Sequence, residues 1–291
     1  MTVAIDLSRV PLPDLIQTLS FEAILVDIKA YANLVYPFID LESDPVVMLM
    51  EAFAYRELLL RARINDAGRG AFIATASGAD LDNLAALFGV VRLVLSPADL
   101  TVTPVVDAVY ESDTALRYRA QLALEGFSTA GPRDAYRFHA LSVDARIISL
   151  TVTSPSPGSV LVTYYAADAN GDQVTDLTDK IFDALSGENV RPLCDTVIVQ
   201  PAAIVAYDIT ATLETGTGPD AEIVRQASQD AATKYAASRR VIGEPVPLSG
   251  IYAALHQPGV DSVALIEPSA EVAVMDGEVG VVGAIVVTVA P

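Results

Sequence analysis

The most reactive side chains of this sequence are one cysteine, Cys194, and two histidines, His139 and His256. A nucleophilic thiolate requires a histidine, a cation or a helix N-terminus close to the sulfur. Arg191 lies three residues before Cys194, but an acid, Asp195, directly follows it, and a neighbouring carboxylate disfavours the thiolate. We therefore predict that Cys194 is not a nucleophile.

The run from Cys194 to Gln200 alternates polar and apolar residues, which predicts a half-buried strand. One face of that strand carries the even-numbered residues Cys194, Thr196, Ile198 and Gln200, and the other carries Asp195, Val197 and Val199. We expect Arg191 to bond a carbonyl or carboxylate where a helix passes into this strand.

His139 and His256 each lie on a predicted short helix, in "YRFHALS" and "AALHQPG". A catalytic dyad or a metal pair would need both of them, or one of them with a nucleophile, so we expect structural roles for both. A single cysteine excludes an internal disulfide and any zinc site built from several cysteines. The sequence predicts no catalytic residue, no metal and no cofactor.

The segment Asp168–Asp179 resembles an EF-hand calcium loop through the oxygen side chains at its first, third and fifth positions. Gln173 stands where the sixth position needs glycine, and Asp179 replaces the glutamate of position twelve. A turn at residues 170–171, followed by a helix capped at residue 175 or 176, explains the segment better.

The stretch "ETGTGPDA" resembles a dinucleotide-binding turn with glycines at positions 216 and 218. Pro219 removes a backbone donor where a phosphate would bind, and Asp220 and Glu222 place negative charge at the start of the following helix. We interpret this stretch as a loop and a helix cap.

The chain of 291 residues carries a net charge of −19, from 18 basic and 37 acidic residues, and 52% of it is hydrophobic. It can build real cores, but its surface repels phosphates, so neither nucleic acid nor anionic lipid is an expected partner. The apolar run "VGVVGAIVVTVAP" is too short to cross a membrane and predicts a terminal strand, so we expect no membrane insertion.

The first 90 or so residues favour helices. Ser20 is the expected cap of one helix that Pro37 stops, and Asp44 with Pro45 begins a second that runs to about Ala67, where Gly68 and Gly70 loosen it. A shorter helix ends near Gly89.

The second helix is apolar nearly all round, because only Glu51, Arg56 and Glu57 are charged between Val46 and Leu60. Such a helix must be buried on more than one side. Either it is the central core helix of its own domain, or partner helices cover it.

The rest of the chain predicts an α+β fold. Residues 93–109 are β-like and punctuated by proline, and "SPSPGS" is a hairpin turn between adjacent strands. Two units then follow in similar order, each with a short helix led by proline before a Val-Asp strand start. We predict an N-terminal helical region (1–92) and two small α+β modules (93–203 and 204–291) with mostly antiparallel sheets.

Several long stretches resemble one protein family. They include "DPVVMLMEAFAYRELLLRARINDAGRGAFIATASGADLDNLAALFGVVR", "FSTAGPRDAYRFHALS", "VTSPSPGSVLVTYY", "ENVRPLCDTVIVQPA" and "IYAALHQPGVDSVALIEPSAEV". The resemblance is to the phage-tail baseplate assembly protein J family, the wedge proteins of contractile-tail baseplates. Members usually carry threonine at the position of Cys194, which agrees with a structural residue there.

The resemblance implies a structural protein without enzymatic activity. It implies that two copies join one smaller wedge protein, similar to protein I, through an N-terminal helical bundle. Six such wedges would form a ring around the hub, meet the sheath-initiator protein and sheath, and act when the sheath contracts. The protein would assemble in the host cytoplasm and end in the baseplate of a phage tail or a phage-tail-like bacteriocin.

Within the bundle we expect the partner interface to include Leu49, Phe53, Leu60 and Ile64. The alternative function is a tail-associated hydrolase that uses His139 or Cys194.

Overall fold

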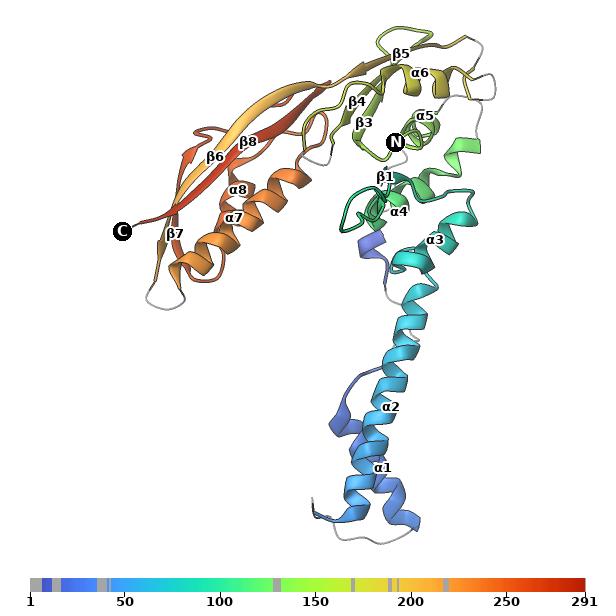
Figure 1. Cartoon of the computed structure of the whole chain (residues 1–291), viewed down its shortest axis with the longest axis vertical. Helices are drawn as coiled ribbons and strands as arrows, with labels where there is room; N and C mark the ends of the chain where they lie inside the picture. Colours follow the sequence, from blue (N-terminus) through green and yellow to red (C-terminus); the bar gives the residue numbers. More distant parts are fainter. Residues whose placement is uncertain are drawn as a thin grey trace. The chain divides into compact units, whose positions relative to one another are not determined.

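A computed structural model describes residues 7–11, 17–35, 41, 43–127, 132–168, 171–187, 190–192, 194–216 and 220–290 (Figure 1). The chain divides into two compact units, residues 1–92 with 112–121, and residues 93–111 with 122–291. Helices dominate the first unit and small sheets covered by helices make up most of the second, so the predicted α+β class is confirmed.

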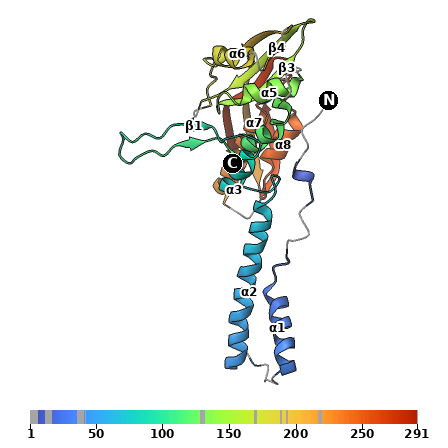
Figure 2. The same cartoon turned by 90° about the vertical axis from the view of Figure 1, so that its right-hand side faces the viewer.

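The first unit is helical. Its described residues form a 3-10 turn, η1 (Leu7–Arg9), and four helices: α1 (Phe21–Val35), α2 (Pro45–Gly70), α3 (Gly78–Ala86) and α4 (Asp113–Leu122). The helices α1 and α2 lie side by side (Figure 2). Ser20 Oγ accepts the Ala23 amide at 3.2 Å, and Asp44 Oδ1 accepts the Val46 amide at 2.8 Å, which confirms both predicted caps. Pro37 lies outside the described residues.

The expected loosening of α2 at Gly68 is wrong, because the helix continues to Gly70. One interior glycine costs only about 1 kcal/mol relative to alanine, which a long packed helix can offset. At Gly70 a Cβ would lie 2.6 Å from Asp80 Oδ2, so a larger residue there would require the Asp80 side chain to move. Gly89, at φ +72°, follows the end of α3 as predicted.

Arginines fasten the returning helix α4 to the α3 region. Arg92 bonds both Asp82 and Asp113 at 2.7 Å, and Arg117 donates to the carbonyl of Ile73 at 2.7 Å. The hydrogen bond from Arg92 lowers the pKa of the Asp113 carboxyl. Residues 92 and 113 are therefore held together independently of the segment between them.

The second unit opens with a hairpin of β1 (Val94–Ser96) and β2 (Val109–Tyr110). A 3-10 turn, η2 (Glu125–Phe127), and α5 (Arg133–Leu141) follow. Next come β3 (Ile147–Thr153), β4 (Ser159–Ala166), α6 (Thr178–Ser186) and β5 (Thr196–Pro201). In the sheet, β3 is antiparallel to β4 and β5 is parallel to it. The predicted hairpin turn between β3 and β4 is confirmed, with Gly158 at φ +78°.

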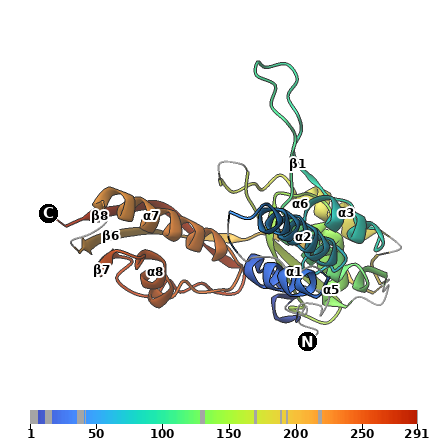
Figure 3. The same ribbon diagram turned by 90° about the horizontal axis from the view of Figure 1, so that it is seen from below.

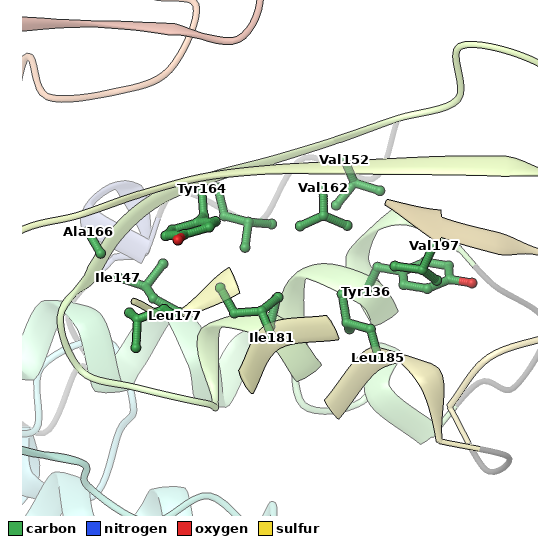
Figure 4. Close-up of a cluster of buried hydrophobic side chains, with 12 residues drawn as sticks. Tyr136, Ile147, Val152, Val162, Tyr164, Ala166, Leu177, Ile181, Leu185 and Val197 are labelled. Carbon is green, nitrogen blue, oxygen red and sulfur yellow. The ribbon is translucent and has the colours of Figure 1, made fainter. Parts of the chain in front are cut away.

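Helices α5 and α6 bury a core against this sheet (Figure 4). Tyr136 from α5, Tyr164 from β4 and Ile181 from α6 are among its largest fully buried side chains. Leu177 is also fully buried and occupies the N-cap position of α6. The predicted cap at residue 175 or 176 is therefore wrong, because α6 begins at Thr178 and Leu177 is its N-cap residue.

The last part contains β6 (Ala203–Thr215), α7 (Ala221–Ser238), α8 (Leu248–Leu255), β7 (Val260–Glu267) and β8 (Glu278–Val289). The central strand β6 is antiparallel to β7 and parallel to β8. Both three-stranded sheets are thus mixed rather than mostly antiparallel, because helical connections between β4 and β5 and between β6 and β8 permit parallel pairing. The predicted terminal strand is β8.

The two sheets share one design. Each has a central strand, an antiparallel edge strand preceded by a short helix (α5–β3 or α8–β7), and a parallel edge strand. The order along the chain differs, because the helix–strand pair comes before the central strand β4 but after the central strand β6.

Ala202 lies between β5 and β6 and joins the two sheets, and both its backbone amide and its carbonyl are hydrogen-bonded. Its amide donates to the Tyr164 carbonyl at 2.8 Å, and its carbonyl accepts Gln173 Nε2 at 2.8 Å. Ile242 donates its amide to Ser149 Oγ at 3.1 Å, and both residues are buried. A small apolar cluster closes the junction, so β3–β5 and β6–β8 belong to one compact unit.

Candidate assembly interface

Cys194 lies in an exposed turn just before β5. The prediction that it belongs to the strand is wrong, because β5 begins at Thr196. The alternation is correct from there on, with Val197 buried and Ile198 exposed. Arg191 Nη1 donates to the carbonyl of Asp195 at 3.3 Å, which confirms the expected role of that arginine.

Asp195, the acid beside the cysteine, is bound by a distant tyrosine. The Tyr136 hydroxyl donates to Asp195 Oδ2 at 2.9 Å. Burial raises the pKa of Tyr136 above its ordinary value, and the bond to Asp195 raises it further. This contact joins α5 to the segment that enters β5, so these motif residues stabilise the sheet.

The two histidines belong to different modules. His139 lies on α5, where its Nε2 is 3.2 Å from the Gly126 carbonyl and its ring meets Phe138 edge-on at 5.4 Å. Burial lowers the pKa of His139, and the Gly126 contact opposes that shift. His256 is an exposed residue at the C-cap of α8. The structure therefore gives His139 a packing role in holding η2.

The two loops that resemble ligand sites are built as turns and caps. Asp168 Oδ1 accepts the Asp172 amide at 2.9 Å, while Asn170 lies outside the described residues. Asp220 Oδ1 accepts the Glu222 amide at 3.0 Å and caps α7; residues 217–219 of the glycine-rich stretch also lie outside the described part.

Across the described ranges, no group of three or more His, Cys, Asp and Glu side chains is placed to hold a metal ion. Within the same ranges, every helix is too short or too polar to cross a membrane.

One face of α2 packs against α1 and the segment before it. Val47 and Ala54 are buried on this face. Asn65, only 3% exposed, clamps Gln17 by accepting its amide at 2.6 Å and donating to its carbonyl at 2.8 Å. A buried polar side chain with both bonds satisfied fixes the register of the two segments.

The four predicted interface residues lie on a second face of α2 and remain 42–59% exposed. They line two neighbouring parts of a groove between α1 and α2, of about 450 Å³ and about 810 Å³, which share Ile28 and Phe53 in their linings. Leu49 lines the first part, Leu60 and Ile64 line the second, and Phe53 lines both. The structure therefore brings all four side chains to one groove.

A third face of α2 is also apolar and exposed, through Met48, Tyr55 and Leu59. At about 100° per residue, these residues lie roughly 120° from the groove face and from the face that α1 covers. The predicted interface residues did not include this stripe. The sequence did indicate it, because there are almost no charges between Val46 and Leu60. We call Leu49, Phe53, Leu60 and Ile64 the groove stripe, and Met48, Tyr55 and Leu59 the outer stripe.

These two stripes are suited to binding helices. Full burial of one leucine or phenylalanine side chain stabilises an interface by about 1.5–3 kcal/mol. An apolar patch of this length on an isolated unit marks a protein contact or an aggregation hazard. Neither stripe presents a set of groups for proton transfer.

Comparison with known proteins gives a consistent match along the chain. Residues 42–99 match the Baseplate J-like N-terminal domain, residues 128–201 the Baseplate J-like central domain, and residues 207–288 the Baseplate J-like protein C-terminal domain. The chain is 43% identical over 277 residues to baseplate protein J of Escherichia phage P2, and the match covers 92% of each protein.

A similar chain occurs in the six-fold symmetrised cryo-EM structure of the anti-feeding prophage baseplate. Its TM-score to this chain is 0.30 at 10% sequence identity, and the match covers 91% of this chain. It covers 53% of the other chain, so this protein spans about half of that length.

Proposed function

Since this chain belongs to the baseplate J family, we propose that its α1–α2 hairpin is the surface through which it joins the other wedge subunits. The family is one of structural proteins, and the chain is a structural component of the baseplate of a phage tail or tail-like particle. A hydrolase that uses His139 or Cys194 is not retained.

The proposed assembly is a wedge. Two copies of this chain would pair with one smaller wedge protein, similar to protein I, through the helical hairpins. Six wedges would surround the hub, contact the sheath-initiator protein and the sheath, and change arrangement when the sheath contracts. In this proposal residues 1–92 form the bundle region, and residues 93–203 and 204–291 form the two α+β modules.

The observation that supports this proposal is the distribution of apolar residues on α2. The helix is apolar on three faces, and α1 covers one of them. Two uncovered faces on one helix provide places for two further helical neighbours, which is the requirement of a bundle with more than one partner chain.

The test places charges in the groove stripe. The double variant Phe53→Asp, Leu60→Asp would put unpaired carboxylates in a dry interface, at a cost of several kcal/mol. Because both side chains are more than half exposed in the unbound chain, we expect the variant to stay soluble and folded. It should fail to co-purify with the smaller wedge protein when the baseplate genes are co-expressed.

The matched control is Arg63→Asp, which introduces a carboxylate at an exposed position of the same helix outside both stripes. We expect it to bind normally. A double variant that forms the complex at wild-type stoichiometry would place the interface elsewhere. A double variant that aggregates while the control does not would mean that the stripe belongs to an intramolecular core.

A further inference from the structure

The segment from Leu93 to Glu111, which we call the arm, is a long hairpin (Figure 3). At its base the Leu93 amide donates to Glu111 Oε1 at 2.9 Å, and the Glu111 amide donates to the Leu93 carbonyl at 3.0 Å. Further out, Asp99 and Val106 exchange amide–carbonyl bonds at 2.9 and 3.1 Å. Asp99 also accepts the amide of Thr101 at 2.8 Å. These bonds pair the two halves of the arm at its base and at the Asp99–Val106 bridge.

The arm exposes many large apolar side chains to solvent. Seven large apolar side chains on it are more than 40% exposed: Val94, Leu100, Val102, Val105, Val106, Val109 and Tyr110. An isolated two-stranded hairpin is at best marginally stable in water and needs a further layer or strand. Because Pro97 and Pro104 lack backbone donors, packing of another surface on the arm's faces fits better than extension of its edges.

The negative charge of the arm indicates which kind of partner surface it can bind. The arm contains Asp99, Asp107 and Glu111 and no lysine or arginine. The whole chain carries −19, so a second copy would bring mostly like charge to the arm. We propose that the arm docks on a non-identical baseplate subunit whose contact surface is apolar and rimmed by lysine or arginine.

This surface is distinct from the α1–α2 hairpin. The arm and the helical hairpin belong to different compact units, and the arm's apolar residues lie outside both stripes of α2. Loss of the arm contact should therefore leave the α1–α2 complex with the smaller wedge protein intact. The two proposals can fail separately. Damage to the α1–α2 hairpin should stop co-purification with the smaller wedge protein, whereas damage to the arm should stop the later addition of that complex to the complete baseplate.

The direct test identifies what touches the arm. A photo-crosslinking benzoylphenylalanine replaces Val105, an exposed arm residue, in baseplates assembled from the co-expressed full-length subunits. Mass spectrometry of the cross-linked peptides should find a different subunit, at a segment with apolar residues flanked by lysine or arginine. Cross-links to a second copy of this chain, or no cross-link in complete baseplates, would overturn the proposal.

A second test makes three of the seven exposed apolar side chains polar and keeps the strands. The triple variant Val102→Thr, Val105→Thr, Val106→Thr retains β-branched side chains, so the arm should remain extended. We expect it to form the complex with the smaller wedge protein normally, and to lower the yield of complete baseplates about tenfold, the equivalent of about 1.4 kcal/mol. Asp107→Lys should also lower the yield, with a weaker effect at high salt.

The control for folding replaces residues 97–108 with Asn-Gly, a two-residue hairpin turn. Arg92 and Asp113 remain paired outside the arm, so the shortened chain should unfold at the wild-type temperature. Its baseplate yield should fall at least as far as that of the triple variant. Wild-type yields from both the shortened and the triple variant would overturn the proposal.

Discussion

The hydroxyl of Tyr136 and the carboxylate of Asp195 form a 2.9 Å hydrogen bond between residues that are 59 positions apart in the chain. Tyr136 is 2% exposed and belongs to the core under β3–β5, while Asp195 lies at the entrance to the edge strand β5. The bond therefore ties the segment that leads into β5 to the core helix α5.

Replacing Tyr136 with phenylalanine should lower the free energy of unfolding by about 1.5–3 kcal/mol, because a hydrogen bond to a charged group is lost and Asp195 loses its donor. Urea denaturation of the second unit measures this difference. Tyr252→Phe is the matched control, since Tyr252 occupies a similar place on α8 but is exposed. Equal stability of the two variants would contradict a structural role for the Tyr136–Asp195 bond.

His139→Gln should change how stability responds to acid. Burial lowers the pKa of His139 in the folded chain below its ordinary value of about 6.5. Between these two pKa values the histidine is protonated in the unfolded chain but remains neutral in the folded chain. The free energy of unfolding of the wild type therefore decreases as the pH falls from about 7 through the ordinary histidine pKa. This decrease ends once the pH is below the lowered pKa of His139 in the folded chain. The glutamine variant should lack that part of the loss.

The measurement is the midpoint of urea unfolding for both proteins at several pH values between about 7 and 5. The difference between them isolates His139 from the carboxylates, which titrate in both proteins. His256→Gln is the control for loss of an exposed histidine. A His139→Gln curve parallel to the wild type would show that this histidine does not couple to folding.

Asn65→Ala should loosen the segment before α1. The variant loses both bonds to the Gln17 backbone, which together contribute about 1–3 kcal/mol because each intramolecular hydrogen bond is worth about 0.5–1.5 kcal/mol. Hydrogen exchange of the amides near Gln17 and at the start of α1 should rise. Asn83→Ala is the matched control, since Asn83 is exposed and bonds only its own helix, at Ala79. Unchanged exchange in the Asn65 variant would mean that the clamp does not hold this segment.

Sequence patterns located the elements whose signals are local. The caps at Ser20 and Asp44 were predictable because a polar side chain and a proline act within one turn. The groove stripe was predictable as surface residues because α2 has more apolar positions than one neighbour can cover.

Signals that depend on tertiary contact were missed. The N-cap residue of α6 is the buried Leu177 rather than the nearest polar residue, and Cys194 lies in the turn before β5. The mixed sheets also escaped prediction, because the direction of β5 and β8 depends on how helices cross between strands. The Tyr136–Asp195 bond had no local signal, since only the fold brings the two residues together.

The fragment Leu122–Pro291 should fold on its own and should not bind the smaller wedge protein. Among its described residues, the buried clusters draw on residues between 136 and 287, which the fragment retains. The cut falls at Leu122 because residues 112–121, which hold all of α4 but its last residue, belong to the first unit, where Arg117 and Arg119 bond carbonyls of residues 73, 76 and 91. We expect a single cooperative thermal transition for the fragment, and no co-elution with the smaller wedge protein, because α1 and α2 are absent.

A fragment that unfolds without cooperativity would show that the two units depend on each other for stability. Co-elution at wild-type stoichiometry would instead move the wedge contact from the helical hairpin to the α+β modules.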